Sequence, residues 1–355
     1  MTRPARAIID PQAASHNLQL ARRHAPGARV MAVIKADAYG HGIARMARLF
    51  DAADAFAVAS LEEAVALREG GSSKPIVLLE GPFEAAEIAT IVGLGLEVVV
   101  HTFEQIEMLR AARCRLPVWL KFDTGMHRLG FAPQRFAEIV AAARACAAPL
   151  RFMTHFANAH RRGDPSVAAQ QLCFERMLGD TAGERSLANS GALLARPAAH
   201  ADWVRPGLML YGVSPLDDEP AAALGLRPVM TLRSRLIAVR RVAAGEAVGY
   251  GGAFVCPEEM PVGVVAYGYA DGYPRHARTG TPVLVGGVRT QVIGNCSMDM
   301  MTVDLRPVPA AAFGDPVTLW GAGLPVEDVA RASGTIPYEL LCRVRMRAHY
   351  SEGAP

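Results

Sequence analysis

Between residues 30 and 205 the sequence alternates apolar stretches with helical patterns, and the alternation is repeated eight times. The apolar stretches are typical of buried strands and cover residues 30–35, 55–60, 75–80, 96–101, 117–123, 150–156, 185–190 and 203–205. The helical patterns cover residues 41–50, 61–69, 83–92, 103–112, 133–147, 167–178 and 191–194. Alternating strands and helices form parallel βαβ units, and eight units favour a closed (β/α)8 barrel of the TIM type. An open doubly wound sheet is the alternative, but no Gly-x-Gly-x-x-Gly follows the first of these strands.

After about Pro228 the sequence changes to short β-rich runs, at residues 230–242, 261–268, 281–285, 288–293, 301–305 and 317–320. Gly286-Gly287 separates two of these runs and indicates a tight hairpin turn. A helix is expected at residues 326–332 and a strand at residues 336–348. Residues 5–9 predict a short strand ahead of a helix that begins at Asp10-Pro11. We therefore predict a barrel domain at residues 1–228 and a mostly antiparallel β domain at residues 229–355.

The composition describes an ordinary globular chain of 355 residues, with 51% hydrophobic and 20% charged residues. A net charge of +3 is too small to indicate nucleic acid as a partner. No apolar run is long enough to cross a membrane, and the N-terminus lacks the apolar segment of a signal peptide, so we expect a cytoplasmic protein. The six cysteines form no Cys-x-x-Cys pair or zinc pattern, so we expect reduced thiols and no metal.

The active site of such a barrel lies at the carboxyl ends of its strands. Polar residues stand at or just after five of the predicted strands and would converge on one mouth: Lys35, Tyr39, Lys121, Asp123, Arg128, His155, Asn189, Ser190, Arg205 and Gly207. Taken singly, His155 fits a structural histidine and Ser190 a helix cap. Phosphate is often bound by the loops after the seventh and eighth strands, where Ser190 and Gly207 stand. The coincidence of these residues on one face predicts an active site.

Lys35 is the most unusual of these residues, because it ends the buried run Val30 to Ile34. Burying an ammonium group is costly without a partner, but the cost is acceptable if the amine is needed in its neutral form. A desolvated lysine loses its proton more easily and can form a Schiff base with a carbonyl group. For an isolated lysine, a side chain that reaches solvent is the simpler interpretation.

Residues 33–42 read Val-Ile-Lys35-Ala-Asp-Ala-Tyr39-Gly-His-Gly, which resembles the pyridoxal-phosphate lysine motif of the alanine racemases. Lys121-Phe-Asp-Thr-Gly-Met-His-Arg128-Leu-Gly resembles the second signature of that family, and Val204-Arg205-Pro-Gly-Leu-Met-Leu-Tyr211-Gly resembles its cofactor-ring segment. Four further segments are similar to signatures of its C-terminal domain: Gly249-Tyr250-Gly251, Gly268-Tyr269-Ala-Asp-Gly-Tyr-Pro-Arg275, Ser297-Met298-Asp299 and Pro337-Tyr338-Glu339. The resemblance spans nearly the whole chain, whereas single-domain relatives lack the last four segments.

The resemblance implies a pyridoxal 5′-phosphate-dependent enzyme that interconverts L-alanine and D-alanine. Lys35 would hold the cofactor and act as a base on one face of the substrate Cα. Tyr250, from the other subunit of a homodimer, would act on the opposite face. A tyrosine is a poor base unless a positive neighbourhood lowers its pKa, and a hydrogen-bonded chain through His155 and Arg205 would supply it. Arg205 would also face the pyridine nitrogen. Because arginine stays protonated, the cofactor remains a weaker electron sink, which suits a racemase better than an aminotransferase.

The resemblance also implies the remaining site residues. Arg128 would contact the cofactor's phenolic oxygen and the substrate carboxylate. Lys121 stands at a position that is often carbamylated in the family, and an ordinary lysine paired with a carboxylate is the alternative. The cofactor would further be bound by Tyr39, Asn189, Ser190, Gly207, Leu208 and Tyr338. The Met298 backbone would contact the substrate carboxylate, and the entry would be lined by Tyr269, Arg275, Asp299 and Tyr338, of which Arg275 and Asp299 fit plain packing equally well.

Three segments depart from the family pattern. Gly294-Asn295-Cys296 stands where Gly-Arg-Val is expected in many relatives, and Met346-Arg-Ala-His-Tyr350 replaces a more usual Val-Pro-Arg-x-Tyr. Ala159-His160-Arg161 stands where acidic residues are common. None of the segments includes the two proposed bases. The departures therefore bear on the entry surface, the dimer contacts and the fine substrate preference.

The expected role is to supply D-alanine for peptidoglycan precursors or to catabolise it. One alternative is a racemase of serine or of a basic amino acid, although such enzymes are often exported. A second is a barrel-fold decarboxylase of basic amino acids, which would need acidic residues near the ring nitrogen, where Arg205 stands. A third is a non-catalytic cofactor-binding protein, but such proteins resemble the barrel alone and lack a C-terminal domain with Tyr250.

Overall fold

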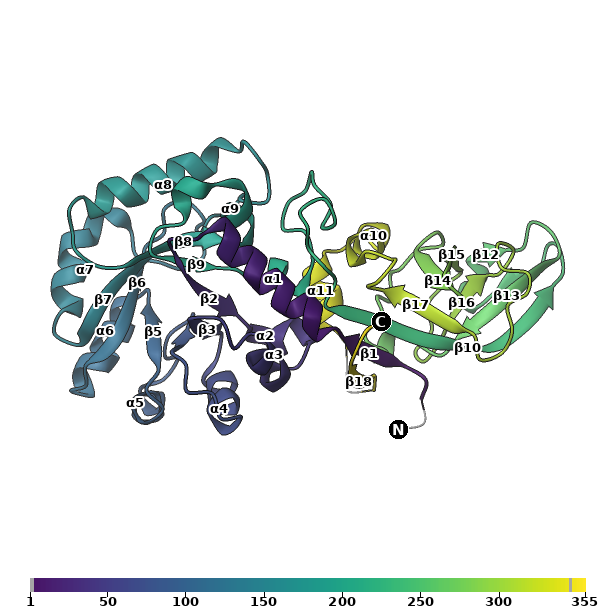
Figure 1. The fold of residues 1–355 in the computed structure, drawn as a ribbon, viewed down its shortest axis with the longest axis horizontal. Coiled ribbons are helices and arrows are strands. Elements are labelled where there is room, and N and C mark those ends of the chain that lie inside the picture. The colour runs from purple at the N-terminus through teal and green to yellow at the C-terminus, as the bar shows by residue number, and fades with distance from the viewer. Residues whose placement is uncertain (1–2, 345–346) are drawn as a thin grey trace. The chain divides into compact units, whose positions relative to one another are not determined.

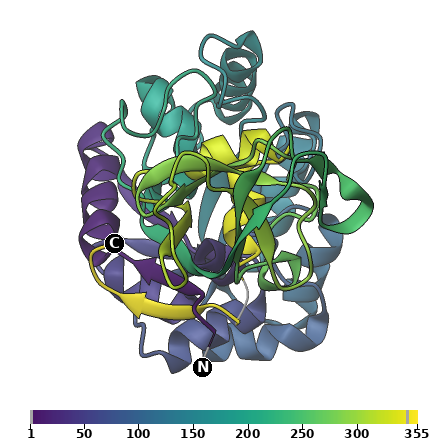
Figure 2. The same cartoon turned by 90° about the vertical axis from the view of Figure 1, so that its right-hand side faces the viewer.

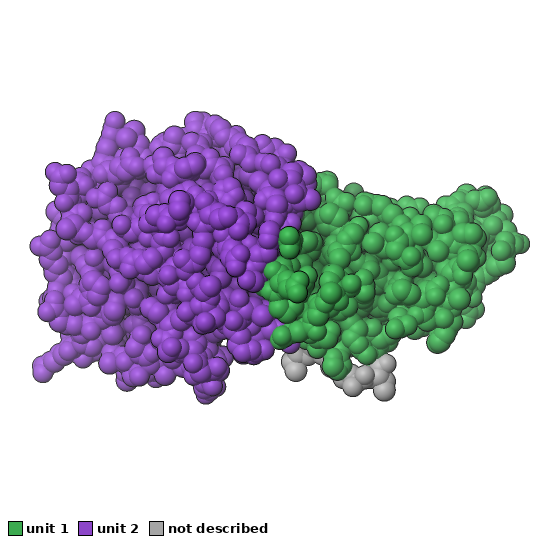
Figure 3. Space-filling view, in the orientation of Figure 1, with its two compact units in different colours: residues 1–14, 211–213, 227–355 green, residues 15–210, 214–226 purple. Residues whose placement is uncertain are grey.

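The computed structural model describes residues 3–344 and 347–355. It divides into two compact units, shown in Figure 3. The barrel unit contains residues 15–210 and 214–226, and the β unit contains the described residues of 1–14, 211–213 and 227–355. The sequence predicts residues 1–228 as one domain, whereas here residues 3–14 belong with the β unit. The reason is that β1 (Arg6–Ile9) pairs antiparallel with β10 (Met230–Val242).

Eight parallel strands close the barrel unit, so the predicted (β/α)8 barrel is confirmed. In chain order they are β2 (Arg29–Val33), β3 (Ala55–Val58), β4 (Ile76–Leu78), β5 (Glu97–Val100), β6 (Leu116–Lys121), β7 (Ala147–Met153), β8 (Arg185–Asn189) and β9 (Trp203–Arg205). The ring closes where β2 pairs with β9, in the register Arg29 with Trp203 and Val30 with Val204. All four residues of β3 are buried, as expected for a strand covered on both faces.

Helices follow the strands and lie outside the ring (Figure 1). They are α2 (Lys35–Gly40), α3 (Ile43–Leu49), α4 (Leu61–Glu69), α5 (Ile88–Gly93), α6 (Phe103–Ala111), α7 (Phe136–Ala143), α8 (Pro165–Leu178) and α9 (Ser190–Ala195). Side-chain caps begin three of them, because Thr102, Asp164 and Asn189 each accept a hydrogen bond from a backbone N–H of the first turn. The chain passes from the β unit into the barrel unit within α1 (Pro11–His24).

The β unit is built on a mostly antiparallel sheet in the strand order β13-β16-β15-β14-β17-β10-β1-β18. Its remaining strands are β13 (Met260–Val265), β14 (Pro282–Val285), β15 (Val288–Ile293), β16 (Met301–Asp304), β17 (Pro316–Trp320) and β18 (His349–Glu352). Figure 2 views these strands from a second direction. Gly286 and Gly287 join β14 to β15 with φ angles of 56° and 84°, so the predicted hairpin turn is confirmed.

One prediction for this unit is wrong. Residues 336–344 do not form a strand, because α11 (Pro337–Cys342) occupies most of them and buries Leu340 and Leu341. Pro337 stands at the first helical position, where its missing N–H costs nothing and its fixed φ suits a helix. Residues 345–346 lie outside the described residues. The predicted helix at residues 326–332 is confirmed as α10 (Val326–Ala332).

Aromatic side chains form part of the core of the β unit. The Tyr273 ring stacks on the Trp320 ring at a centroid distance of 6.2 Å, and it meets the Tyr267 ring edge-on at 6.3 Å. All three are fully buried. Across both units, none of the helices in residues 3–344 and 347–355 is long and apolar enough to span a lipid bilayer.

Candidate active site

The predicted barrel residues leave the strands at one edge of the ring. Lys121, Asn189 and Arg205 are the last residues of β6, β8 and β9, while Lys35 and His155 follow two residues after β2 and β7. Because all eight strands are parallel, these ends share the carboxyl-terminal mouth of the barrel. The mutual electrostatic effects of Lys35, Lys121, His155 and Arg205 described below agree with this placement.

Lys35 is followed by a left-handed helical turn. Residues 36–39 all have φ between 51° and 54° and ψ between 41° and 53°, so α2 is left-handed over these four residues. None of the four is glycine, and the left-handed conformation costs an L-residue roughly 1–2 kcal/mol. Such strain persists only where surrounding contacts enforce it, and it is concentrated at functional sites.

Two carboxylates hold this turn in place. Glu63, on α4, accepts hydrogen bonds from the backbone N–H of Ala36 at 2.6 Å and of Ala59 at 2.8 Å. Asp37 accepts one from the N–H of Ile43 at 2.6 Å, at the start of α3. Glu63 therefore ties the residue after Lys35 to the end of the neighbouring strand. The sequence does not reveal this function, because Glu63 is one of two acidic residues in the first turn of an ordinary helix.

The left-handed turn places Tyr39 next to the loop that follows β9. A Cβ added at Gly207 would lie 2.5 Å from the Tyr39 hydroxyl oxygen, so any larger residue there would displace the Tyr39 ring. The Ser190 hydroxyl oxygen accepts hydrogen bonds from the N–H groups of Gly207, at 2.8 Å, and Met209, at 3.4 Å. The helix cap here is Asn189, which accepts from the Ala192 N–H at 3.1 Å. The hydroxyl proton of Ser190 is left to donate, so Tyr39, Ser190 and the glycine cradle fit a phosphate group.

Arg205 is buried under this mouth, with an exposed fraction of 4%. Its guanidinium donates hydrogen bonds to the Thr154 carbonyl at 2.6 Å, to the Leu187 carbonyl at 3.2 Å and to the Ser186 hydroxyl. Burial lowers the pKa of Arg205 to about 10, so the guanidinium keeps its proton at neutral pH. Arg205 can therefore donate hydrogen bonds but does not act as an acid there.

His155 lies against Arg205. Its Nδ1 is 3.4 Å from an Arg205 Nη, and its Nε2 is 3.4 Å from the Asn189 Nδ2. Burial, followed by the charges of Arg205 and Lys121, holds the pKa of His155 well below its usual range. The imidazole is therefore neutral. It can accept a proton or hydrogen bond on one nitrogen and donate on the other.

Lys121 stands in the same positive environment and is only 8% exposed. The pKa of Lys121 is lowered to about 8, first by burial and then by the positive charges of Arg205, Arg128 and Lys35. The negative charge of Glu80 partly opposes this shift. About a tenth of such amines are neutral at pH 7, compared with well under a thousandth for an ordinary lysine. Arg128 itself lies in an exposed loop that Asp123 organises by accepting from the N–H groups of Gly125, Met126 and His127.

Six further predicted site residues belong to the β unit. Tyr250, Tyr269, Arg275, Met298 and Tyr338 are exposed there, and Asp299 is half-buried. Tyr250 has an exposed fraction of 72%, Met298 54%, Tyr338 40% and Tyr269 38%. Tyr269 and Met298 come from two loops that are joined by backbone hydrogen bonds from Tyr269 N to Ser297 O and from Ala270 N to Met298 O. The structure thus groups the predicted residues into a barrel set and a β-unit set.

Comparison with known proteins identifies the family. Residues 9–215 match the family model of the alanine racemase N-terminal domain, and residues 229–351 match that of the alanine racemase C-terminal domain. The chain belongs to the alanine racemase family. The resemblance predicted from the sequence motifs is therefore confirmed.

Curated relatives and solved structures agree with this assignment. The chain is 52% identical to the alanine racemase of Nitrosococcus oceani, over 96% of this chain and 97% of that one, and 53% identical to that of Nitrosospira multiformis, over 98% and 99%. The crystal structure of the biosynthetic alanine racemase from Pseudomonas aeruginosa matches with a TM-score of 0.97 at 49% identity, over 99% of this chain and all of that one. The alanine racemase from Bartonella henselae, with covalently bound pyridoxal phosphate, matches with a TM-score of 0.90 at 29% identity, over 98% and 99%.

The left-handed turn predicts opposite effects for the same substitution at two exposed alanines. Ala36→Gly should raise the free energy of unfolding by about 1 kcal/mol, because glycine adopts the left-handed conformation without a steric penalty. Ala169→Gly, in the right-handed helix α8, should lower it by about 1 kcal/mol. Urea unfolding of both variants measures the two changes. A loss of stability of equal size in both would contradict the strain at Ala36.

Proposed function

We propose that this protein is an alanine racemase, which interconverts L-alanine and D-alanine with pyridoxal 5′-phosphate held on Lys35. The observation that carries the proposal is the strained turn at Lys35, which places Tyr39 against Gly207. The Gly207 N–H donates to Ser190, and the buried Arg205 ends the strand that leads into Gly207. Curated relatives at about half identity over nearly the full chain carry the name alanine racemase, which supports the same activity.

The residues of the barrel mouth fit this cofactor. Bound pyridoxal 5′-phosphate supplies an electron sink that makes the Cα proton of an amino acid removable. Lys35 would bind it covalently, and its phosphate would be held by Tyr39, Ser190, Tyr338 and the Gly207–Leu208 backbone. Asn189 would also contact the cofactor. Arg205 would donate a hydrogen bond to the ring nitrogen and keep its own proton. The electron sink stays weak, and this favours return of the proton to Cα over transamination.

Racemisation needs two proton-transferring groups on opposite faces of Cα. Lys35 serves one face, and Tyr250 of the partner subunit serves the other. The phenol becomes a competent base when a positive hydrogen-bonded neighbourhood lowers its pKa, and the neutral His155 beside the charged Arg205 would supply it. Arg128 and the Met298 backbone would bind the substrate carboxylate, and Tyr269 would line the entry to the site.

Lys121 is proposed to be carbamylated. A neutral amine is the form that attacks carbon dioxide, and the lowered pKa of Lys121 makes this form available near neutral pH. The product would replace one buried cation by an anion. Since Arg205, Arg128 and Lys35 all act on this position, the change of sign would remove repulsion and orient Arg128.

The composite site requires a homodimer. The large exposed side chains Tyr250, Met298 and Tyr338 of the β unit support a protein-binding surface there. We further propose that the enzyme works in the cytoplasm and supplies D-alanine for peptidoglycan or degrades it. The free thiols of Cys114, Cys146, Cys173, Cys256 and Cys296 suit a reducing compartment.

The first experiment pairs an absorbance spectrum of the purified protein with chiral analysis of L-alanine and D-alanine. We expect visible absorbance that borohydride abolishes in the wild type, absence of that covalent signal in Lys35→Ala, and racemisation in both directions. Absorbance with racemisation of serine or a basic amino acid, but not of alanine, would assign a different substrate. Absence of the signal after addition of the cofactor would contradict the proposal as a whole.

The composite site predicts complementation between two inactive variants. Lys35→Ala and Tyr250→Phe should each lose nearly all racemase activity. After dissociation and reassociation of an equal mixture, half of the dimers contain one of each chain, and each of these has one intact site. About a quarter of the wild-type activity should therefore return. Activity that stays absent in the mixed dimers, or full activity of Tyr250→Phe alone, would refute the two-subunit assignment.

The carbamate is tested by carbon-13 NMR after exchange with labelled bicarbonate. We expect one protein-bound carbamate carbon in the wild type that is absent in Lys121→Ala, because Lys121 combines burial with a lowered pKa. Lys74→Ala, which removes a lysine with an ordinary ion pair to Asp51, is the matched control and should keep the signal. A fully active wild type without the signal would mean that Lys121 is an unmodified lysine.

A further inference from the structure

We infer that Asn295 is a positioning residue that holds the backbone of Tyr250 and thereby sets the location of the second base. The inference rests on the proposed function, because it assumes that Tyr250 transfers a proton. Its starting point is one contact: the Asn295 side-chain amide donates a hydrogen bond to the Tyr250 carbonyl at 2.9 Å. Asn295 is one of the positions at which the sequence departs from the expected family pattern, since arginine is expected there in many relatives.

The backbone around Tyr250 needs such a contact. Tyr250 begins a three-residue 3₁₀ turn, and the glycines at 249, 251 and 252 have φ angles of 74°, 71° and 56°. The turn connects β11 (Ala247–Val248) to β12 (Phe254–Val255), which are strands of only two residues each. Three glycines give this segment a large conformational freedom in the absence of tertiary contacts.

The β11–β12 hairpin that carries Tyr250 and the strand β15 that precedes Asn295 contribute to one apolar cluster. Val248 of β11 packs in a buried group with Cys256, Met260, Val262 and Ile293, and Ile293 is the last residue of β15. Gly294 follows, and a Cβ added there would lie 3.0 Å from the Val248 carbonyl oxygen. The segment that carries Asn295 therefore runs directly along the β11–β12 hairpin, next to the turn that begins at Tyr250.

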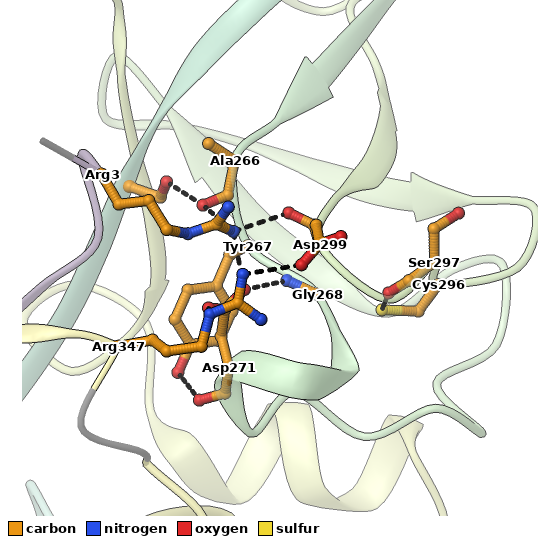
Figure 4. Close-up of polar contacts among 10 residues, drawn as sticks. Arg3, Ala266, Tyr267, Gly268, Asp271, Cys296, Ser297, Asp299 and Arg347 are labelled. Atoms are coloured by element: carbon orange, nitrogen blue, oxygen red, sulfur yellow. Dashed lines mark hydrogen bonds and ion pairs between the residues drawn. The ribbon is translucent and has the colours of Figure 1, made fainter.

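The chain beyond Asn295 is anchored by an ionic network around the buried Asp271, shown in Figure 4. Asp271, which is fully buried, accepts from Arg3 at 2.8 Å and from the Gly268 N–H at 2.9 Å, and it pairs with Arg347 at 3.2 Å. Arg347 also pairs with Asp299 at 2.6 Å, four residues beyond Asn295. The network thus fixes the loop of residues 296–300 through its end at Asp299.

The same loop carries Met298 and contacts the loop of Tyr269. A Cβ added at Gly268 would lie 2.4 Å from the carbonyl oxygens of both Ser297 and Met298, so the two loops are in close backbone contact. Asn295 directly precedes the loop of residues 296–300, and its side-chain amide links this loop to the backbone of Tyr250. One loop would therefore set the positions of the second base, of Tyr269 and of Met298 together.

The chemistry of asparagine suits this role. Its amide is short and neutral, so it constrains the Tyr250 carbonyl without adding a charge beside the phenol. A displacement of a reacting group by about 1 Å can cost roughly a hundredfold in rate. Loss of the contact should therefore impair the proton transfer at Tyr250 and spare the one at Lys35.

The test uses two substitutions and a control. Asn295→Asp keeps the shape of the side chain but removes the donor, and Asn295→Ala removes the side chain. Arg235→Met is the matched control, because Arg235 is an exposed residue of the β unit that donates to the carbonyl of a remote loop, Gly314, at 2.8 Å. All three are compared with the wild-type holoenzyme.

The first readout is Cα hydrogen exchange of each alanine enantiomer in deuterium oxide, measured beside racemisation. We expect both Asn295 variants to racemise alanine roughly 10- to 100-fold more slowly. For the enantiomer whose Cα proton faces Lys35, exchange without inversion should continue at near the wild-type rate. For the other enantiomer, exchange should fall together with racemisation. Arg235→Met should show neither change.

The second readout does not depend on activity. Amide hydrogen exchange of the resting enzyme, followed by mass spectrometry, should show faster exchange in residues 247–256 of both Asn295 variants and unchanged exchange there in Arg235→Met. A purely structural role would lower exchange and racemisation equally for both enantiomers, and that result would overturn the inference. Unchanged rates and unchanged amide exchange would overturn it as well. If the wild type racemised no amino acid, the proposed function would fail, while the amide exchange would still decide whether Asn295 holds the turn.

Discussion

The pairing of the first and last barrel strands is the constraint on which the site depends. Val30 of β2 lies in register with Val204 of β9, and the Val33 N–H donates to the Pro206 carbonyl at 2.9 Å, just below the mouth. This closure brings Lys35 and Arg205 to adjacent positions although they come from opposite ends of the barrel sequence. The contact of Tyr39 with Gly207, and with it the phosphate cradle, exists only in the closed ring.

Closure also concentrates positive charge in a place with little water. The charges of Arg205, Arg128 and Lys35 reach Lys121 and His155 together, and burial is the largest cause of the lowered pKa at both. Buried like charges are costly unless an anion offsets them. A phosphate-bearing cofactor, a substrate carboxylate and a carbamate are all anions. A cluster of positive side chains would destabilise a purely structural core, but the proposed site needs it to bind these anions.

Much of the fold follows from local patterns. The barrel strands are predictable because strands covered on both faces are continuous apolar runs, as in Ala55–Val58. The prediction fails at Pro337–Cys342, where a strand was expected but proline starts a helix. The sequence also does not indicate the neighbours of β1. A strand pattern identifies Arg6–Ile9, but the partners β10 and β18 come from the far end of the sequence, and no local signal encodes such a pairing.

The sequence alone determined the alternation of elements, the set of polar residues at the strand ends and the motifs of the family. The tertiary structure alone decided how those residues are held. Ala-Asp-Ala-Tyr has no intrinsic preference for a left-handed turn. The turn exists because Glu63 binds the Ala36 N–H and the Asp37 side chain binds the N–H of Ile43, just after the turn. In the sequence, Asn295 is noticeable only because it departs from the family pattern. The folded structure shows that its side-chain amide donates a hydrogen bond to the Tyr250 carbonyl. Periodicity records which face of an element is buried, whereas these hydrogen bonds join segments distant in sequence, and only the folded chain brings them together.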